Sequence, residues 1–420
     1  MARILIAGAG LAGRLCAWAL SRTGHAVTVC DPSPDAGARF DGTGAAAFTA
    51  AGMLSPLAEQ EQGGARVAAW GWRSLTLWTG IVQALRPLEV PFRRDGSLLL
   101  AHRSDLGSAQ RILALIPGSE ALSASALQAL EPTLVPGLHG WLLPEEGLIG
   151  PVAAMRALLQ SAPHVDWRWG CAVQAVMPCA LVLTSGERLA ADWVIDTRGL
   201  GAAPDLPVRG VRGEIVTLSL PGHGLRRPVR LLHPRHRVYL VPRTADELAV
   251  GASEIESEDR SPVSLRSAVE LMAAAHSVMP ALTEARILRL DRHLRPALPD
   301  NLPALAHAPG LLRLNGLYRH GWLLAPAMVE HMLGGAGLAS LHALAQVAPI
   351  TAAAAAAGAA PAAVPHQQSP LRPPVGERTI PPTPPTPPTP AFPPAFPPAS
   401  PPAFSPLSPL AGIPLPPSSS

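Results

Sequence analysis

The chain has 420 residues, of which 48% are hydrophobic and 15% are charged, and its net charge of +3 is too small to indicate a nucleic-acid partner. This length predicts two to three domains, at roughly 150 residues each. All 33 basic residues are arginine, which excludes lysine Schiff-base chemistry and phosphate-binding loops that depend on a lysine.

The cysteines and the apolar segments indicate the compartment. The four cysteines are scattered and form no CxxC pair, which is typical of proteins in a reducing cytosol. Glycines interrupt the apolar start of the chain, so it does not resemble a signal peptide, and no apolar run is long enough for a transmembrane helix. We therefore expect a cytoplasmic protein with no membrane partner.

The first thirty-one residues predict one βαβ unit. Aliphatic residues 3–9 predict a strand, residues 11–23 a helix, and residues 25–30 a second strand. Gly8, Gly10 and Gly13 permit a tight turn, close approach of backbone to a pyrophosphate, and close packing of helix on strand. Asp31 ends the second strand, where it can accept both ribose hydroxyls and would repel a 2′-phosphate. The unit predicts binding of NAD or FAD without distinguishing them.

The later elements predict an α/β fold in which a dinucleotide-binding Rossmann-like domain carries an inserted substrate domain with a mixed or antiparallel sheet. Helices are predicted over 66–85 and 262–276 and from residue 327. Strands are predicted over 96–101, 167–176, 181–183, 193–195, 215–220, 237–241, 247–252 and 311–314. We assign 1–75, 145–205 and 290–348 to the cofactor domain, and 76–144 and 206–289 to the substrate domain.

The composition changes sharply near residue 349. Residues 349–420 contain an alanine run followed by Pro-Pro-Thr and Ala-Phe-Pro-Pro repeats. Because proline fixes φ and lacks a backbone donor, this segment predicts a disordered tail. A ligand for a proline-recognition module is one interpretation, and an extension without a role is the one we favour.

Three further segments concentrate unusual residues and favour FAD. The small residues of 47–56 would let a flat ring system lie against backbone. Residues 316–322 join a predicted strand to a helix and hold Tyr318, one of only two tyrosines. Residues 295–303 predict a rigid turn, bounded by prolines, that holds Arg295.

Seven motifs in this order resemble those of the D-amino-acid oxidase family of flavoproteins, and within it the glycine oxidases of thiamine biosynthesis. They are GAGLAG at 8–13, AAGMLSP at 50–56, DTRGLG at 196–201, VRGE at 211–214, YLVPR at 239–243, RPALPD at 295–300 and GLYRHGWLLAP at 316–326. The resemblance covers residues 1 to about 340, and the tail has no counterpart. Leu298 and Asn301 stand where relatives often have Thr and Gly. Asn tolerates a positive φ, so we expect the turn to survive.

The resemblance implies the role of each matching residue. Arg295 would hold the substrate carboxylate with its planar fork, Tyr239 would donate to the same carboxylate, and Arg319 would lie beside flavin and substrate. Hydride would pass to the flavin N5 without a side-chain base. Non-covalent FAD would be held by Gly8, Gly10, Leu11, Ala12, Gly13, Asp31, Ala51, Gly52, Met53, Val173, Gly316, Leu317, Tyr318, Arg319, His320, Gly321, Trp322 and Leu323.

The implied activity is oxidative deamination of glycine, or of another small amino acid, to the imine or glyoxylate, with O2 reduced to H2O2. The partners would be enzymes of thiazole synthesis, and the question of a homo-oligomer is left open.

Two alternatives remain, a D-amino-acid dehydrogenase that passes electrons to quinone and a non-catalytic flavin-binding protein. Sarcosine oxidases use a cysteine tether and a lysine, but no cysteine follows Cys179 and there is no lysine. No metal is expected, because His233 and His236 lack a third ligand.

Overall fold

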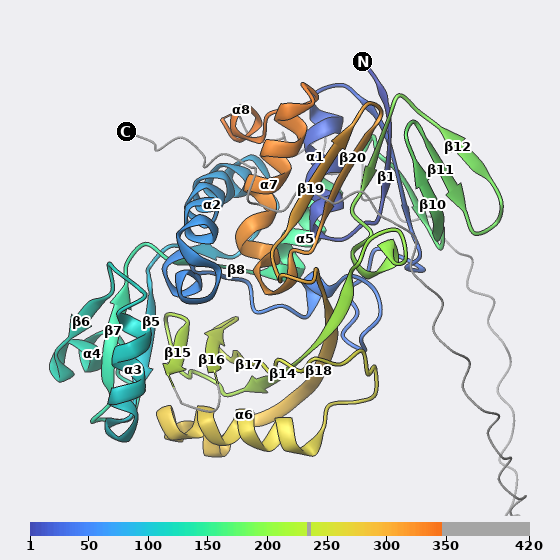
Figure 1. Ribbon diagram of the computed structural model, residues 1–420. Helices are drawn as coiled ribbons and strands as arrows, with labels where there is room; N and C mark the ends of the chain where they lie inside the picture. Colours follow the sequence, from blue (N-terminus) through green and yellow to red (C-terminus); the bar gives the residue numbers. More distant parts are fainter. Residues whose placement is uncertain (233–236, 347–420) are drawn as a thin grey trace, which may run out of the picture. The chain divides into compact units, whose positions relative to one another are not determined.

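The computed structural model describes residues 1–232 and 237–346 (Figure 1). The predictions for the tail over 349–420 and for the His233–His236 pair lie outside the described residues. Within the described ranges, no helix is long and apolar enough to cross a membrane.

A six-stranded sheet forms the base of the cofactor half. Its strands lie in the order β19–β20–β13–β1–β2–β9, and all neighbours are parallel except β19 and β20. With α1 (Leu11–Arg22) between β1 and β2, it contains the predicted βαβ unit. The strands are β1 (Arg3–Ala7), β2 (Ala26–Asp31), β9 (Asp166–Trp169), β13 (Trp193–Asp196), β19 (Ala304–Ala308) and β20 (Leu311–Asn315).

Side chains alternate between the two faces of this sheet, so each face builds a separate core. On β1, Ile4 and Ile6 join the core formed with four helices, whereas Leu5 and Ala7 pack against a small three-stranded sheet. The helices are α1, α2 (Pro56–Ala84), α5 (Pro151–Gln160) and α7 (Gly321–Gly335), and α8 (Leu341–Ala345) packs on α2. The small sheet contains β10 (Val173–Met177), β11 (Ala180–Leu183) and β12 (Arg188–Ala190).

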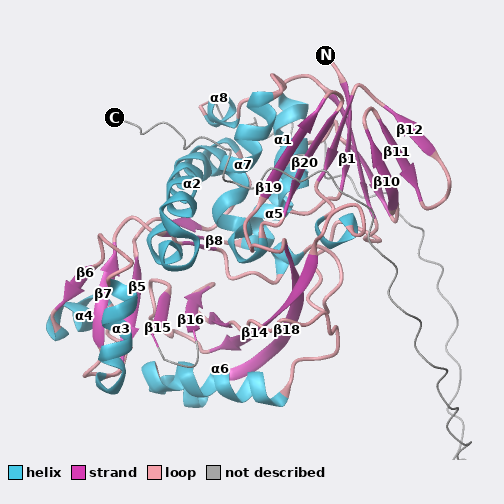
Figure 2. Cartoon of the chain, in the orientation of Figure 1, coloured by secondary structure: helices cyan, strands magenta, loops and turns pink. Residues whose placement is uncertain are grey.

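An eight-stranded mixed sheet forms the second half (Figure 2). Its order is β18–β14–β17–β16–β15–β5–β7–β6, and α6 (Leu265–Val278) covers one face through an apolar core. Its strands are β5 (Ser97–Ala101), β6 (Glu120–Leu122), β7 (His139–Leu143), β14 (Arg209–Ser219), β15 (Val229–Leu232), β16 (Arg237–Pro242), β17 (Glu247–Gly251) and β18 (Arg286–Ala297). The remaining α-helices are α3 (Leu106–Leu113) and α4 (Ala124–Leu130), and a fourth sheet contains β3 (Met53–Leu54), β8 (Gly147–Ile149) and β4 (Phe92–Arg93).

The strands of the two large sheets alternate along the chain, as an inserted domain requires. The predicted boundary at residue 290 falls inside β18, and the one at residue 75 falls inside α2. Since a strand and a helix are single structural units, we propose to move these boundaries to the ends of β18 and α2.

Glycines account for two predicted elements that differ from the structure. The strand predicted over 167–176 is two strands in different sheets, β9 and β10, separated at Gly170 with φ of 69°. The helix predicted over 66–85 is the second part of α2, and a further helical segment from Pro56 precedes it. The two parts meet at Gly64, whose φ of 69° is not helical. Proline suits the first helical turn, and a positive φ is readily reached only by glycine.

Candidate functional site

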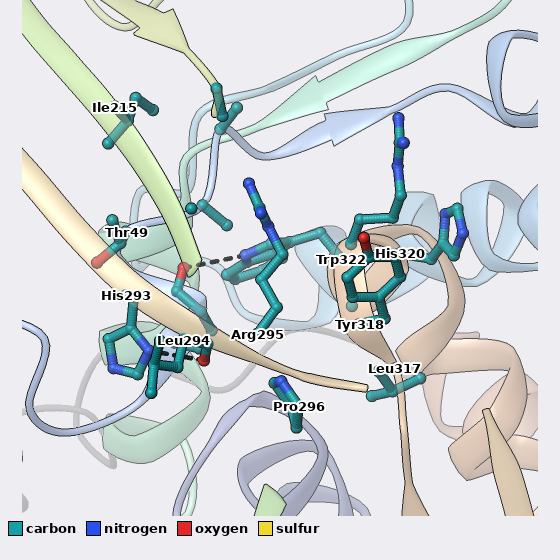
Figure 3. Close-up of a pocket in the computed structure, with 18 of the residues that line it drawn as sticks. Thr49, Ile215, His293, Leu294, Arg295, Pro296, Leu317, Tyr318, His320 and Trp322 are labelled. Carbon is teal, nitrogen blue, oxygen red and sulfur yellow. Dashed lines mark hydrogen bonds between the residues drawn. The ribbon is translucent and has the colours of Figure 1, made fainter. Parts of the chain in front are cut away.

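One cavity of about 1410 Å³ lies between the carboxyl ends of the six-stranded sheet and the inner face of the eight-stranded sheet. It exceeds the roughly 300–1,000 Å³ of a typical small-ligand pocket, as a dinucleotide together with a substrate would require. Every predicted site residue lines it except Gly13. The close-up in Figure 3 shows Arg295, Tyr318 and Trp322, which come from β18, the 318–320 turn and α7.

The glycine loop after β1 fits a pyrophosphate. Gly8 has φ of 98°, and a Cβ there would lie 2.8 Å from the carbonyl oxygen of Thr197. A Cβ on Gly13 would collide with the carbonyl oxygen of Gly8, so Gly13 packs the helix on the loop without facing the cavity. At Gly10 a Cβ would meet nothing within 4 Å. No side chain caps the start of α1 and its first turn holds no acid, so its N–H groups can face a phosphate.

Asp31 ends β2 at the edge of the cavity, as predicted. Its Oδ2 accepts a hydrogen bond from the Ala9 N–H at 2.6 Å, and its Oδ1 accepts one from Ser33 at 2.8 Å. Arg14, which no sequence motif indicates, supports the same loop by donating to the carbonyls of Ala9 and Met155, both at 2.9 Å. Burial lowers the pKa of Arg14 to about 10, with Asp31 opposing, so Arg14 stays charged at neutral pH.

The loop over residues 47–54 is fixed from two sides. Arg243 donates to the carbonyls of Ala51 and Ala50 at 2.6 and 2.8 Å, and burial lowers its pKa to about 10. Trp322 donates its indole N–H to the carbonyl of Ala47 at 3.1 Å and stacks on Trp78. The motif YLVPR therefore has a second role at Arg243, which holds the loop where a flat ring system was predicted to lie.

Arg295 lies in the last part of β18 and not in a turn, which corrects the sequence prediction. The turn follows it, and Asn301 has φ of 60° there, as expected from its tolerance of positive φ. The long pairing of β14 with β18, in which Val211 faces Arg295, extends the strand through the first proline. The Arg295 guanidinium donates to the carbonyls of Ser253 at 3.1 Å and Arg212 at 3.4 Å.

The three predicted substrate residues differ in their electrostatic surroundings. Among the described residues, Arg295 has no carboxylate within ion-pair distance, so its charge is available to a ligand. Burial raises the pKa of Tyr239, which keeps the phenol protonated as a donor, although Arg295 opposes this shift. Arg319, in contrast, lies 3.2 Å from both Glu59 and Glu254 and contacts Gln62. We therefore propose Arg295, and not Arg319, as the anchor for a carboxylate.

Glu59 on α2 joins the two halves of the site. Its carboxylate is buried and lies 2.9 Å from Arg230 on β15, 3.2 Å from Arg319 and 3.3 Å from Nδ1 of His320. Burial alone would raise its pKa, but the two arginines and His320 outweigh burial and hold the pKa well below the usual range. Nothing in the sequence pattern indicates this role, because Glu59 and its partners are far apart along the chain.

Tyr318 has φ of 48°, a left-handed conformation that is rare for a bulky residue and often marks a functional site. Its hydroxyl donates to Oε1 of Glu254 at 2.6 Å. Glu254 follows β17 among other acidic residues, and no motif in the sequence distinguishes it. No group of three or more His, Cys, Asp or Glu side chains in the described part of the chain is arranged to hold a metal ion.

A glycine loop and an acid at the end of the second strand of one sheet, with an arginine and a tyrosine on a second sheet facing the same cavity, are typical of a dinucleotide-dependent oxidoreductase. Residues 3–333 match the family described as FAD dependent oxidoreductase. The chain belongs to this family, and the loop, the cavity and the fixed 47–54 segment fit FAD as its cofactor.

Similar proteins support this assignment. The chain is 39% identical over 328 residues to a putative thiamine biosynthesis oxidoreductase ThiO of Rhizobium etli, covering 78% of this chain and 94% of the relative. It is 24% identical over 349 residues to a glycine oxidase of Bacillus licheniformis, covering 78% and 91%. The crystal structure of glycine oxidase from Geobacillus kaustophilus matches with a TM-score of 0.68 at 22% identity, covering 80% of this chain and 94% of that one, which shows the same fold.

Proposed function

We propose that this protein is an amino acid oxidase that converts glycine, or another small amino acid, to its imine with FAD as cofactor and O2 as electron acceptor. The observation that carries the proposal is Arg295, whose guanidinium faces the cavity beside Tyr239 and has no ion-pair partner among the described residues. A planar guanidinium fork is suited to bind a carboxylate through two hydrogen bonds. The names of the Rhizobium and Bacillus relatives support the same activity.

The residues of the site account for binding and orientation. Arg295 would hold the substrate carboxylate and Tyr239 would donate to it, which fixes the α-carbon relative to the segment over 316–323. Bound FAD supplies the two-electron oxidation. Glycine and O2 give the imine and H2O2, and water then converts the imine to glyoxylate and ammonia. Positioning by these fixed donors supplies part of the rate acceleration.

The names of the relatives support a proposal for the destination of the product. The Rhizobium relative is named for thiamine biosynthesis, and the motif resemblance points to glycine oxidases of that pathway. We infer that the imine feeds thiazole assembly, with the enzymes of that step as partners.

Anaerobic mixing of the purified holoenzyme with glycine, sarcosine and D-alanine tests this proposal. Glycine should bleach the visible flavin absorbance, and admitting O2 should restore it with one H2O2 formed per imine. A flavin that no amino acid bleaches would overturn the proposal. Bleaching that an artificial acceptor reverses, while O2 does not, would indicate a dehydrogenase instead.

A further inference from the structure

The cavity contains a carboxylate to which the proposed function gives no role. Glu254 lines the cavity three residues after the end of β17, and its side chain is 48% exposed. Oε1 accepts the Tyr318 hydroxyl at 2.6 Å, and Oε2 lies 3.2 Å from the Arg319 guanidinium. A carboxylate offers about four lone-pair positions, so these two contacts leave acceptor capacity. Half of this side chain therefore remains available to a ligand.

The backbone places Glu254 next to the proposed carboxylate anchor. Arg295 donates to the carbonyl of Ser253, the residue that directly precedes Glu254. A carboxylate held by Arg295 would thus lie beside the 253–254 segment. In an α-amino acid the ammonium is on the carbon next to the carboxylate. Binding of the carboxylate by Arg295 would therefore place the ammonium near the same segment.

The neighbours of Glu254 use only part of its carboxylate. Arg319 pairs at 3.2 Å with both Glu254 and the buried Glu59, and Glu59 is shared with Arg230. The Tyr318 hydroxyl donates its hydrogen to Glu254, and its oxygen can still accept a hydrogen bond. Two oxygen acceptors, one of them anionic, are therefore adjacent in the cavity.

We propose that Glu254 and the Tyr318 hydroxyl form an ammonium-binding subsite that selects zwitterionic amino acids over carboxylic acids that lack an amino group. This inference rests on the proposed function, since it takes Arg295 as the anchor of an amino acid carboxylate. The strained backbone of Tyr318 fits the role, because it fixes the hydroxyl against Glu254.

The test compares glycine with glycolate, which has a hydroxyl in place of the ammonium, in the FAD-loaded protein. Glycolate affinity is measured from the change in the flavin spectrum, and glycine affinity from the saturation of anaerobic flavin bleaching. Glu254→Gln keeps the shape but removes the charge. It should weaken glycine roughly ten- to a hundredfold, as expected for a lost charge-assisted hydrogen bond, and leave glycolate nearly unchanged.

Three further variants make the result specific. Glu254→Asp should recover part of the preference for glycine, and Tyr318→Phe should reduce it in the same direction as Glu254→Gln. Glu187→Gln removes a surface carboxylate that pairs with Arg168 outside the cavity, and should change neither affinity. Equal weakening of glycine and glycolate by Glu254→Gln would indicate a structural role and overturn the subsite.

Measurements on the wild-type protein distinguish a failure of the ammonium subsite from a failure of the proposed oxidation. Glycine that perturbs the wild-type flavin spectrum without bleaching it would contradict the oxidation, while its affinity relative to glycolate would still test the subsite. An unchanged glycine-to-glycolate ratio in Tyr318→Phe would overturn the subsite even if Glu254→Gln fails to fold.

Discussion

The guanidinium of Arg295 lies against Gly213 on the neighbouring strand β14, in the space that a side chain at position 213 would occupy. The same arrangement recurs at the second anchor, where a Cβ on Gly251 would lie 2.6 Å from the Tyr239 hydroxyl oxygen. Two glycines on the inner face of the eight-stranded sheet thus leave room for both proposed substrate anchors.

Gly213→Ala should impair substrate binding while keeping FAD. The added methyl group must displace the Arg295 guanidinium, which is the end of a flexible side chain, so the sheet itself need not move. Losing the aligned fork should raise the KM for glycine about tenfold or more, since a charge-assisted hydrogen bond is worth about 1.5–3 kcal/mol. Steady-state kinetics and flavin content measure the two effects.

Gly107→Ala is the matched control for this substitution. Gly107 is exposed on α3, where a Cβ would meet nothing within 4 Å. Alanine should stabilise that helix by up to about 1 kcal/mol and leave KM unchanged. A Gly213→Ala protein with the wild-type KM would show that Arg295 does not depend on this space.

Arg295→Lys should lower kcat/KM for glycine by one to two powers of ten. Lysine keeps the charge but loses the planar fork and with it one of two parallel hydrogen bonds, worth about 1.5–3 kcal/mol. KM should rise and the rate of flavin reduction should fall, whereas the flavin spectrum should stay close to wild type. Tyr239→Phe should act in the same way but more mildly, because it removes one neutral donor.

Arg319→Lys distinguishes the two arginines of the site. The charge of Arg319 is balanced by Glu59 and Glu254, so this variant should change the flavin spectrum or the stability more than the KM for glycine. If Arg319→Lys raises KM tenfold while Arg295→Lys does not, the assignment of the carboxylate anchor is wrong.

The sequence predicted the local units well because their chemistry is local. The glycine loop, Asp31 and the turn at Asn301 depend on which residues tolerate a given φ, and the structure places them as expected. The sequence predicts a turn at Arg295 because the prolines that follow it give no sign of the pairing of β18 with β14, which is set by a partner about eighty residues away.

Residues that act through long-range contacts could not be found from the sequence. Glu59 on α2 meets Arg230 and Arg319, which lie 171 and 260 positions further along the chain. Glu254 meets Tyr318 from a segment with several acidic residues and no distinguishing motif. Only the packing of the two sheets around one cavity brings these charges together.

FAD should be released when the protein is denatured. Of the four cysteines only Cys30 lines the cavity, and it does so beside Asp31, far along the chain from the segment over 316–323. Burial, with Cys171 nearby, raises the pKa of Cys30 to about 11, so its thiol stays protonated. After acid precipitation the yellow colour should be in the supernatant. Colour retained in the pellet would contradict this prediction and make His320 the first candidate for a covalent link.

Glu59 should make the stability of the protein depend on acid pH. Its folded-state pKa is held well below the unfolded value of about 4.3, so its stabilising effect is fully present above that value and is lost as pH falls below it. Glu59→Gln leaves Arg230 without its ion-pair partner and weakens the neutralisation of Arg319. At pH 7 it should cost about 3 kcal/mol or more of the free energy of unfolding.

Glu146→Gln is the control for Glu59→Gln, because burial shifts the pKa of Glu146 in the opposite direction. Glu146 is fully buried and accepts hydrogen bonds from Ala58 and Ser97, and burial raises its pKa although Arg230 opposes the shift. Its charged form therefore opposes folding as pH rises above about 4.3, and removing that charge should cost little at pH 7. Urea unfolding of the holoenzymes at pH 7 and pH 4 measures both variants. The deficit of Glu59→Gln should shrink at pH 4, and an equal deficit at both pH values would show that Glu59 acts through packing and not through its charge.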